Sequence, residues 1–173
     1  MTHNRGFSLI EVLITLVLVC IGVLGMVALQ SRAVQYTQDS VQRNIAASLA
    51  NDLIELMRSN PDGLPASSDF YKAAGSDFPA APSGGCASTS NVPSEQLACW
   101  AQKAGKLLPG ATALLSSDFY ICRSRTAGAC SSNTGSAIEI QIAWQVKAGE
   151  CMDNSDTNNS TSTICRYRLR SEI

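Results

Sequence analysis

One carboxylate lies inside the most apolar part of this chain. Phe7 opens a predominantly apolar run of 23 residues that ends at Leu29, and Glu11 is its only charged residue. A helix of about 20 such residues crosses the hydrocarbon core of a bilayer, where an unpaired carboxylate is costly and usually functional. The chemistry open to Glu11 is charge pairing, since a cation against it would neutralise both groups. The alternative is that Glu11 stays hydrated near the interface.

The other residue types give little support for catalysis. The only histidine, His3, lies in the polar leader before the apolar run, so acid–base or triad chemistry based on histidine has no candidate elsewhere. Neither a phosphate-binding glycine pattern nor a C-x-x-C motif occurs. We therefore expect no enzyme activity, no catalytic residue, no metal and no cofactor.

The residues around Glu11 resemble a processing site. The stretch Gly6-Phe7-Ser8-Leu9-Ile10-Glu11, preceded by the basic Arg5, is similar to the leader junction of type IV prepilins and of the related pseudopilins of type II secretion. The resemblance implies that residues 1–6 are a leader, that prepilin peptidase cuts between Gly6 and Phe7, and that the new amino group of Phe7 is methylated. Glu11 would then pair with the Phe7 ammonium of another subunit in the pilus core.

Two alternatives exist for this segment, an ordinary cleaved signal sequence and an unprocessed single-span anchor. Against the cleaved signal, Glu11 would fall within its apolar region, and no A-x-A cleavage site follows. Arg5 agrees with a cytoplasmic N-terminus. Together with the resemblance, this implies a location in the inner membrane, crossed once, with the head in the periplasm.

A closer resemblance covers the first 60 residues or so. The stretch 22–57, with Ser31-Arg32-Ala33 and the residues from Leu53 to Asn60, is similar to PilV-like minor pilins of type IV pili. It implies a structural subunit that primes pilus assembly in a tip-located complex on the cell surface, could support a tip adhesin, and is needed for pilus biogenesis and twitching motility. Its implied partners are other minor pilins, the major pilin, prepilin peptidase and the assembly platform of the inner membrane.

Two other functions stay open. Minor pseudopilins of type II secretion share the leader, and a pilin module could bind DNA or a surface. Arginines at 166, 168 and 170 form a basic row, with Arg123 and Arg125 expected nearby. A net charge of −1 argues against a strong attraction for nucleic acid, so we expect a solvated strand face or a contact with another pilin.

The apolar run is expected to continue as one helix over residues 7–59, divided into a membrane half (7–29) and an amphipathic half (30–60). Apolar residues recur at helical spacing, namely Val34, Val41, Ile45, Leu49, Leu53 and Leu56 or Met57. Polar residues that include Asp39 and Arg43 are assigned to the wet side. Pro61 ends the pattern.

The remainder, 61–173, is expected to form a globular head. Its first part, 61–116, is an irregular connection with a short helix over 94–108, capped by Ser94 and stopped by Pro109-Gly110. In 117–173, alternation predicts strands over 117–123, 138–147 and 165–170, the middle one buried on one face. The fold class is thus α+β, a long helix packed on a small antiparallel sheet, which is also the architecture that the resemblance implies.

The distribution of the cysteines supports the expectation that the head is exported. Cys20 lies alone in the apolar run, whereas the other six lie between 86 and 165, as expected for disulfides formed in an oxidising compartment. Six cysteines allow 15 pairings. We expect the nearest-neighbour pairs, Cys86 with Cys99, Cys122 with Cys130, and Cys151 with Cys165. A zinc site is the rival, but it lacks histidine in the head.

Overall fold

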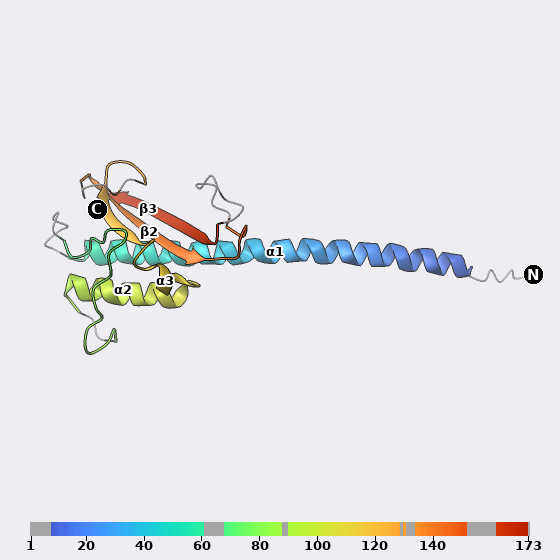
Figure 1. Ribbon diagram of the computed structural model, residues 1–173, viewed down its shortest axis with the longest axis horizontal. Coiled ribbons are helices and arrows are strands. Elements are labelled where there is room, and N and C mark those ends of the chain that lie inside the picture. Colours follow the sequence, from blue (N-terminus) through green and yellow to red (C-terminus); the bar gives the residue numbers. More distant parts are fainter. Residues whose placement is uncertain are drawn as a thin grey trace, which may run out of the picture. The chain divides into compact units, whose positions relative to one another are not determined.

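The computed structural model describes residues 8–60, 68–87, 90–128, 130, 134–151 and 162–172. The elements are α1 (Leu9–Arg58), α2 (Pro93–Leu107), α3 (Ala111–Leu114), β1 (Tyr120–Ser124), β2 (Ala137–Gln145) and β3 (Ile164–Glu172). Figure 1 shows a long helix and a small sheet, which confirms the predicted α+β class. The chain divides into two units, residues 1–38 and residues 39–173, and the second is called the head below.

The first unit consists of the N-terminal part of α1. Its large apolar side chains are exposed, from Leu9 at 85% to Leu29 at 74%. Among the described residues, α1 is the one helix with the length and composition to cross a membrane, and none of its most apolar window is buried by the chain itself. In the described structure, this part of the helix therefore presents an apolar surface that other described residues do not cover.

The head begins within the same helix, where one face of α1 becomes buried. The buried side chains are spaced by three or four residues, as expected for a helix that packs on one side; they are Ala46, Leu49, Ala50, Leu53, Ile54 and Met57. The predicted stripe is wrong at its N-terminal end, because Val34 and Val41 are exposed by 55% and 51%. Val34 belongs to the first unit, and Val41 lies on a side of α1 that the head leaves exposed.

Asp39 was assigned to the wet side, and this is also wrong. Asp39 is only 3% exposed, because the head covers this turn of α1. Arg43 compensates the buried carboxylate, since its Nε donates to Asp39 Oδ2 at 2.8 Å. The disulfide sulfur of Cys165 lies 3.8 Å from the other carboxylate oxygen. The first residue of the head is thus a buried ion-pair partner.

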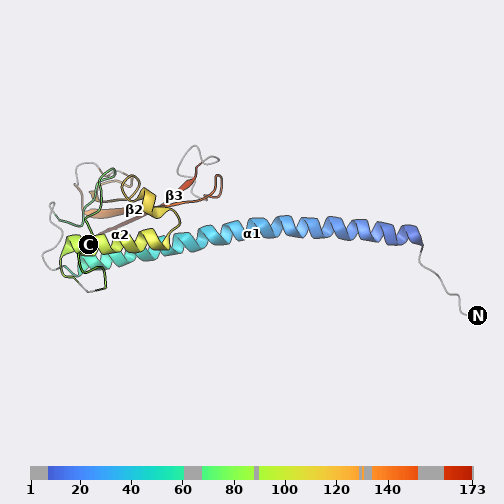
Figure 2. The ribbon, with the colours of Figure 1, turned by 60° about the horizontal axis from the view of Figure 1, so that its bottom comes forward.

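The sheet is antiparallel with the order β1-β2-β3. Ile140 of β2 lies opposite Ile121 of β1 and Leu169 of β3, so the apolar side chains of all three strands share one face. The head part of α1 and α2 lie on the same side of the sheet (Figures 1 and 2). Trp100 of α2 ties the two helices together, because its Nε1 donates to the Leu49 carbonyl of α1 at 2.8 Å.

The middle strand differs from the prediction, because β2 is buried on both faces up to Trp144. The apolar face meets the helices. The polar face is covered by the loop after β1, where the Gly128 amide donates to both Glu139 oxygens at 2.9 and 3.1 Å. The Cys122–Cys130 disulfide holds that loop against the strand. Alternation within β2 could not reveal this non-local cover.

The short helix α2 begins one residue before its predicted start, and its cap was predicted wrongly. Pro93 occupies the start of the helix and Val92 is the N-cap, without a side-chain hydrogen bond. Proline is favoured there because its missing amide would have no partner. The predicted stop holds, because Gly110 follows α2 in a left-handed conformation with φ of 63°. A Cβ at this position would collide with the Gln145 side chain.

Three disulfides connect Cys86 with Cys99, Cys122 with Cys130, and Cys151 with Cys165. Their Cα atoms lie 5.4, 5.7 and 5.5 Å apart, within the range that a disulfide spans without backbone distortion. They are the three nearest-neighbour pairs that the sequence analysis predicted. Each one fixes irregular chain onto a helix or a strand, so the disulfides supplement a small core.

The two tryptophans provide a matched test of how the helices are joined. Both are buried, but Trp100 has its hydrogen bond to α1, whereas Trp144 Nε1 has no hydrogen-bond partner among the described residues. We expect Trp100→Phe to lower the free energy of unfolding by about 1 kcal/mol more than Trp144→Phe, because only the first change removes a hydrogen bond. Urea unfolding of the full chain in a non-ionic detergent, followed by circular dichroism, measures both. Equal losses would show that the Trp100 bond does not join the helices.

Candidate functional site

The N-terminal motif is the first candidate. Gly6 and Phe7 lie outside the described residues. Ser8 precedes α1, and its carbonyl accepts the amides of Glu11 and Val12 at 3.0 and 3.3 Å. Glu11 therefore falls in the first turn of the helix, where the positive end of the helix dipole favours a carboxylate.

Glu11 is exposed in the part of the chain that the structure describes. Its neighbours Leu9, Ile10 and Val12 are exposed by 85%, 66% and 47%. In the described part of the chain, no lysine or arginine forms an ion pair with Glu11. In an apolar environment this carboxylate would need a cation from outside the chain, or its own new N-terminus, to be tolerated.

The polar face of the sheet is the second candidate. Arg166, Arg168 and Arg170 of β3 lie opposite Ala143, Gln141 and Glu139 of β2 and so share its polar face. Each arginine is fixed, through Asp118 Oδ1 at 2.9 Å, Gln141 Oε1 at 2.6 Å and the Arg125 carbonyl at 2.7 Å, respectively. The predicted basic row is therefore an ordered surface.

Arg123 does not join this row. It pairs with Ile138 in the register of β1 and β2, so it lies on the opposite face from Arg170. Arg125 follows the end of β1, and its carbonyl accepts from Arg170. Strand alternation alone would place 123 and 125 on the same face. They are separated because β1 ends at Ser124, and the sequence did not show where the chain would turn.

Beneath the basic row lies a buried carboxylate that sequence reasoning did not single out. Glu139 is 1% exposed, and the Tyr120 hydroxyl donates to its Oε1 at 2.7 Å. Burial, followed by this hydrogen bond to a carboxylate, raises the pKa of Tyr120 well above its usual value. Glu139 therefore holds β1 and the 125–128 loop on β2.

Lys72 is a second buried charge that sequence reasoning missed. It is 3% exposed, and its Nζ donates to the carbonyls of Phe119, Ser116 and Ala73 at 2.7, 3.0 and 3.1 Å. The backbone of Lys72 also bridges Ile121 of β1. Burial lowers the pKa of Lys72 to about 8, against the raising effect of Asp77 and Asp118. The side chain thus anchors the chain before α2 to the sheet.

Other parts of the head offer less defined chemistry. A groove of about 930 Å³ lies beside α1 and α2, lined by the Cys86–Cys99 disulfide and by the Asp52–Lys103 ion pair. Within the described ranges, no group of three or more histidine, cysteine, aspartate or glutamate side chains could hold a metal ion.

Family models account for the N-terminal part of the chain. The model described as the prokaryotic N-terminal methylation motif matches residues 1–27, and the model described as type IV pilin Tt1218 matches residues 28–102. The chain is a type IV pilin. Searches of curated proteins and of solved structures found no match. The pilin match ends within α2, so the basic face of the sheet lies outside the matched residues.

The family match indicates how the N-terminal motif is used. Pilins are structural proteins, and the methylation motif implies processing by prepilin peptidase and assembly into a pilus with other pilins. The apolar part of α1 fits anchoring in a membrane before assembly.

Lys72 predicts how the stability of this pilin depends on pH. The folded chain loses the Lys72 proton near pH 8, whereas an unfolded lysine keeps it to about 10.5. The unfolded state thus binds more protons between these values, so the free energy of unfolding should rise with pH across this window. Above about pH 10, the raised pKa of Tyr120 acts in the opposite direction, since the unfolded tyrosine ionises first.

The measurement is urea unfolding between pH 7.5 and 10 in a Cys20→Ser background, which prevents thiol–disulfide exchange. We expect the rise in stability to disappear in Lys72→Met. If that variant kept the same rise, Lys72 would not be its cause.

Proposed function

We propose that this pilin is a PilV-like minor pilin, a structural subunit that primes pilus assembly within a complex at the pilus tip. The observation that carries the proposal is the uncovered N-terminal part of α1, with Glu11 as the only charge among exposed apolar residues from Leu9 to Leu29. Such a surface is suited to a core of packed helices. The similarity of Ser31-Arg32-Ala33 and of residues 53–60 to PilV-like proteins supports a pilus rather than a secretion system.

The processing that we propose uses Gly6, Phe7 and Glu11. Prepilin peptidase cuts after Gly6, whose missing side chain permits close approach to the backbone, and methylates Phe7. The new ammonium of Phe7 in one subunit then pairs with Glu11 of another, so that neither charge is left uncompensated in the apolar core. Before assembly the chain crosses the inner membrane once, and three disulfides in the head suit the oxidising periplasm.

The subunit functions through contacts with other proteins. It joins other minor pilins and the major pilin, lowers the barrier to starting the fibre, and could carry a tip adhesin. Its contribution to twitching motility follows from that role, since movement requires fibres.

A minor pseudopilin of type II secretion is the alternative, because it would use the same leader. Deletion of the gene separates the two. The proposal predicts that surface fibres and twitching are lost or strongly reduced and that enzyme export is unchanged. Loss of export with normal fibres would instead assign the chain to secretion.

The charge pair is tested by Glu11→Gln, which keeps the shape of the side chain and removes its charge. We expect mass spectrometry to show a normal methylated Phe7 at the N-terminus, and immunoblots of sheared fibres to show at least about tenfold less of the subunit, because an unpaired ammonium is left in the core. Glu55→Gln is the control, since Glu55 lies on the same helix with a side chain that is 68% exposed. Normal fibre content in the Glu11 variant would contradict the pairing.

A further inference from the structure

The outer edge of β3 combines two features that suit a partner segment. In the sheet order β1-β2-β3, β3 pairs only with β2, so in the described part of the chain its other edge has no strand beside it. On one face of this edge strand, Arg166, Arg168 and Arg170 occupy alternate positions. An added strand would form backbone hydrogen bonds along the edge, and its alternate side chains would lie beside the arginines.

The arginines are already held in place. Their hydrogen bonds to Asp118, Gln141 and the carbonyls of Ser124 and Arg125 hold each side chain across the polar face of β2. Arg168 and Arg170 are nevertheless exposed residues. A guanidinium has five N–H donors, and the hydrogen bonds named here use one nitrogen on each of these two arginines. Ordered cations of this kind lose little conformational freedom on binding.

The spacing and charge of this surface define the occupant. Alternate residues of a strand lie roughly 6.6 to 6.8 Å apart, so a second strand with carboxylates on alternate residues would match the arginines one to one. Two carboxylates on this face already have partners within the chain. Glu139 is buried under the 125–128 loop, and Asp118 forms an ion pair with Arg166. Glu172 follows Arg170 on the same face and ends the basic row.

We propose that the outer edge of β3 binds an extended acidic segment of a partner protein, with aspartate or glutamate on alternate residues facing Arg166, Arg168 and Arg170. The proposal does not depend on which pilin-type assembly the chain serves.

Nucleic acid fits this surface less well. Single-stranded nucleic acid is bound by stacking its bases on exposed aromatic rings, but Tyr120 is buried and Tyr167 alternates onto the opposite face. The chain also has a net charge of −1, which gives no long-range attraction for a polyphosphate. An acidic peptide, matched by backbone pairing as well as by charge, uses both features of the edge.

The test uses the full chain in a maltoside detergent and labelled nine-residue peptides, with binding followed by fluorescence anisotropy. One peptide alternates glutamate with threonine and valine, a second has the same composition with its glutamates in one block, and a short oligothymidylate represents nucleic acid. Hydrogen exchange of the 164–172 segment reports whether a strand is added at the edge.

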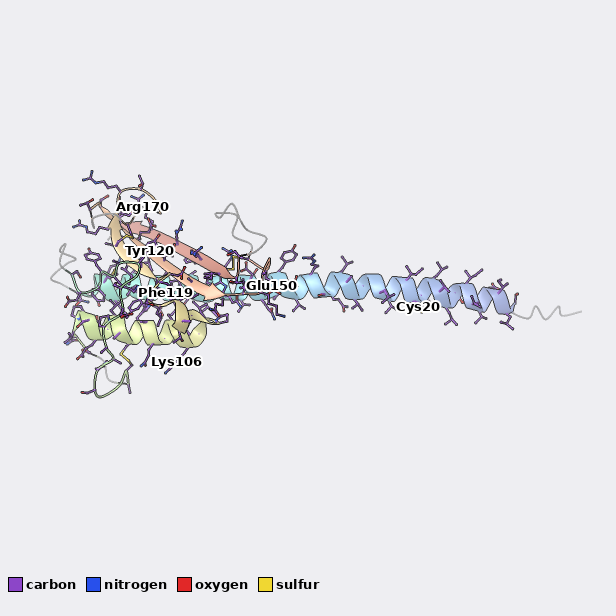
Figure 3. All side chains as sticks on the ribbon, in the orientation of Figure 1. Cys20, Lys106, Phe119, Tyr120, Glu150 and Arg170 are labelled. Atoms are coloured by element: carbon purple, nitrogen blue, oxygen red, sulfur yellow. A yellow bond between two sulfur atoms is a disulfide. The ribbon has the colours of Figure 1, made fainter. Side chains whose placement is uncertain are left out.

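We expect saturable binding of the alternating peptide, at least about fivefold weaker binding of the block peptide, and slower exchange in β3. Arg168→Gln should weaken binding by about tenfold, because it removes one charge-assisted contact. Lys106→Gln, an equal charge change at an exposed position of α2 (Figure 3), should leave affinity within about twofold.

Several outcomes would overturn the proposal. These are equal affinity for the alternating and block peptides, unchanged exchange in β3, tighter binding of the oligothymidylate, or no saturable binding at about 1 mM, the weak end of specific affinity. Because the peptide comparison uses the unaltered chain, the test remains decisive even if Arg168→Gln fails to fold.

Discussion

One helix has to satisfy two different surroundings, and the rest of the structure follows from this constraint. Within the described residues, the apolar side chains of α1 up to Gln38 are exposed. From Asp39 onward the same helix supplies a buried face to the head. The change from exposed to buried side chains along α1 begins at Asp39. This residue is buried beside its ion-pair partner Arg43 and the Cys165 sulfur. A buried carboxylate needs a compensating cation, and the i,i+4 spacing on α1 places Arg43 within reach of Asp39.

The head compensates for its small core by using both faces of the sheet. Beneath the apolar face, Leu49, Leu53 and Met57 of α1 and Trp100 of α2 form the core. On the polar face, Glu139 accepts hydrogen bonds from the Gly128 amide and the Tyr120 hydroxyl. The arginines of β3 extend across β2 on the same face. The disulfides fix the irregular segments around these contacts. In the described part of the chain, this packing orders β3 while its outer edge pairs with no strand, and the apolar N-terminal part of α1 fits membrane anchoring and pilus assembly.

Local patterns predicted the elements of this pilin, and non-local packing decided where prediction failed. The long helix, α2 and the three strands could be placed because helical spacing and alternation are properties of neighbouring residues. Asp39 was misplaced because polarity suggested solvent, whereas burial depends on what packs against the residue. The second buried face of β2 and the Lys72 anchor depend on loops that come from other parts of the chain, so no pattern within 137–145 or around 72 could indicate them. Glu11 could be singled out from its sequence context, because a lone charge in an apolar run is rare, and its pairing with Phe7 of another subunit stays a prediction.

The most direct test of this account is the environment of α1 at Cys20, the one free cysteine of the chain. A nitroxide attached to Cys20 of the full chain in lipid bilayers can be relaxed by oxygen, which concentrates in hydrocarbon, or by a water-soluble nickel chelate. The account predicts strong relaxation by oxygen and little by nickel, and the opposite for a label placed at Ser48, which is exposed on the head part of the helix, in a Cys20→Ser background. A Cys20 label that nickel relaxes as strongly as it does the Ser48 label would contradict the central claim that α1 is shared between an apolar environment and the head.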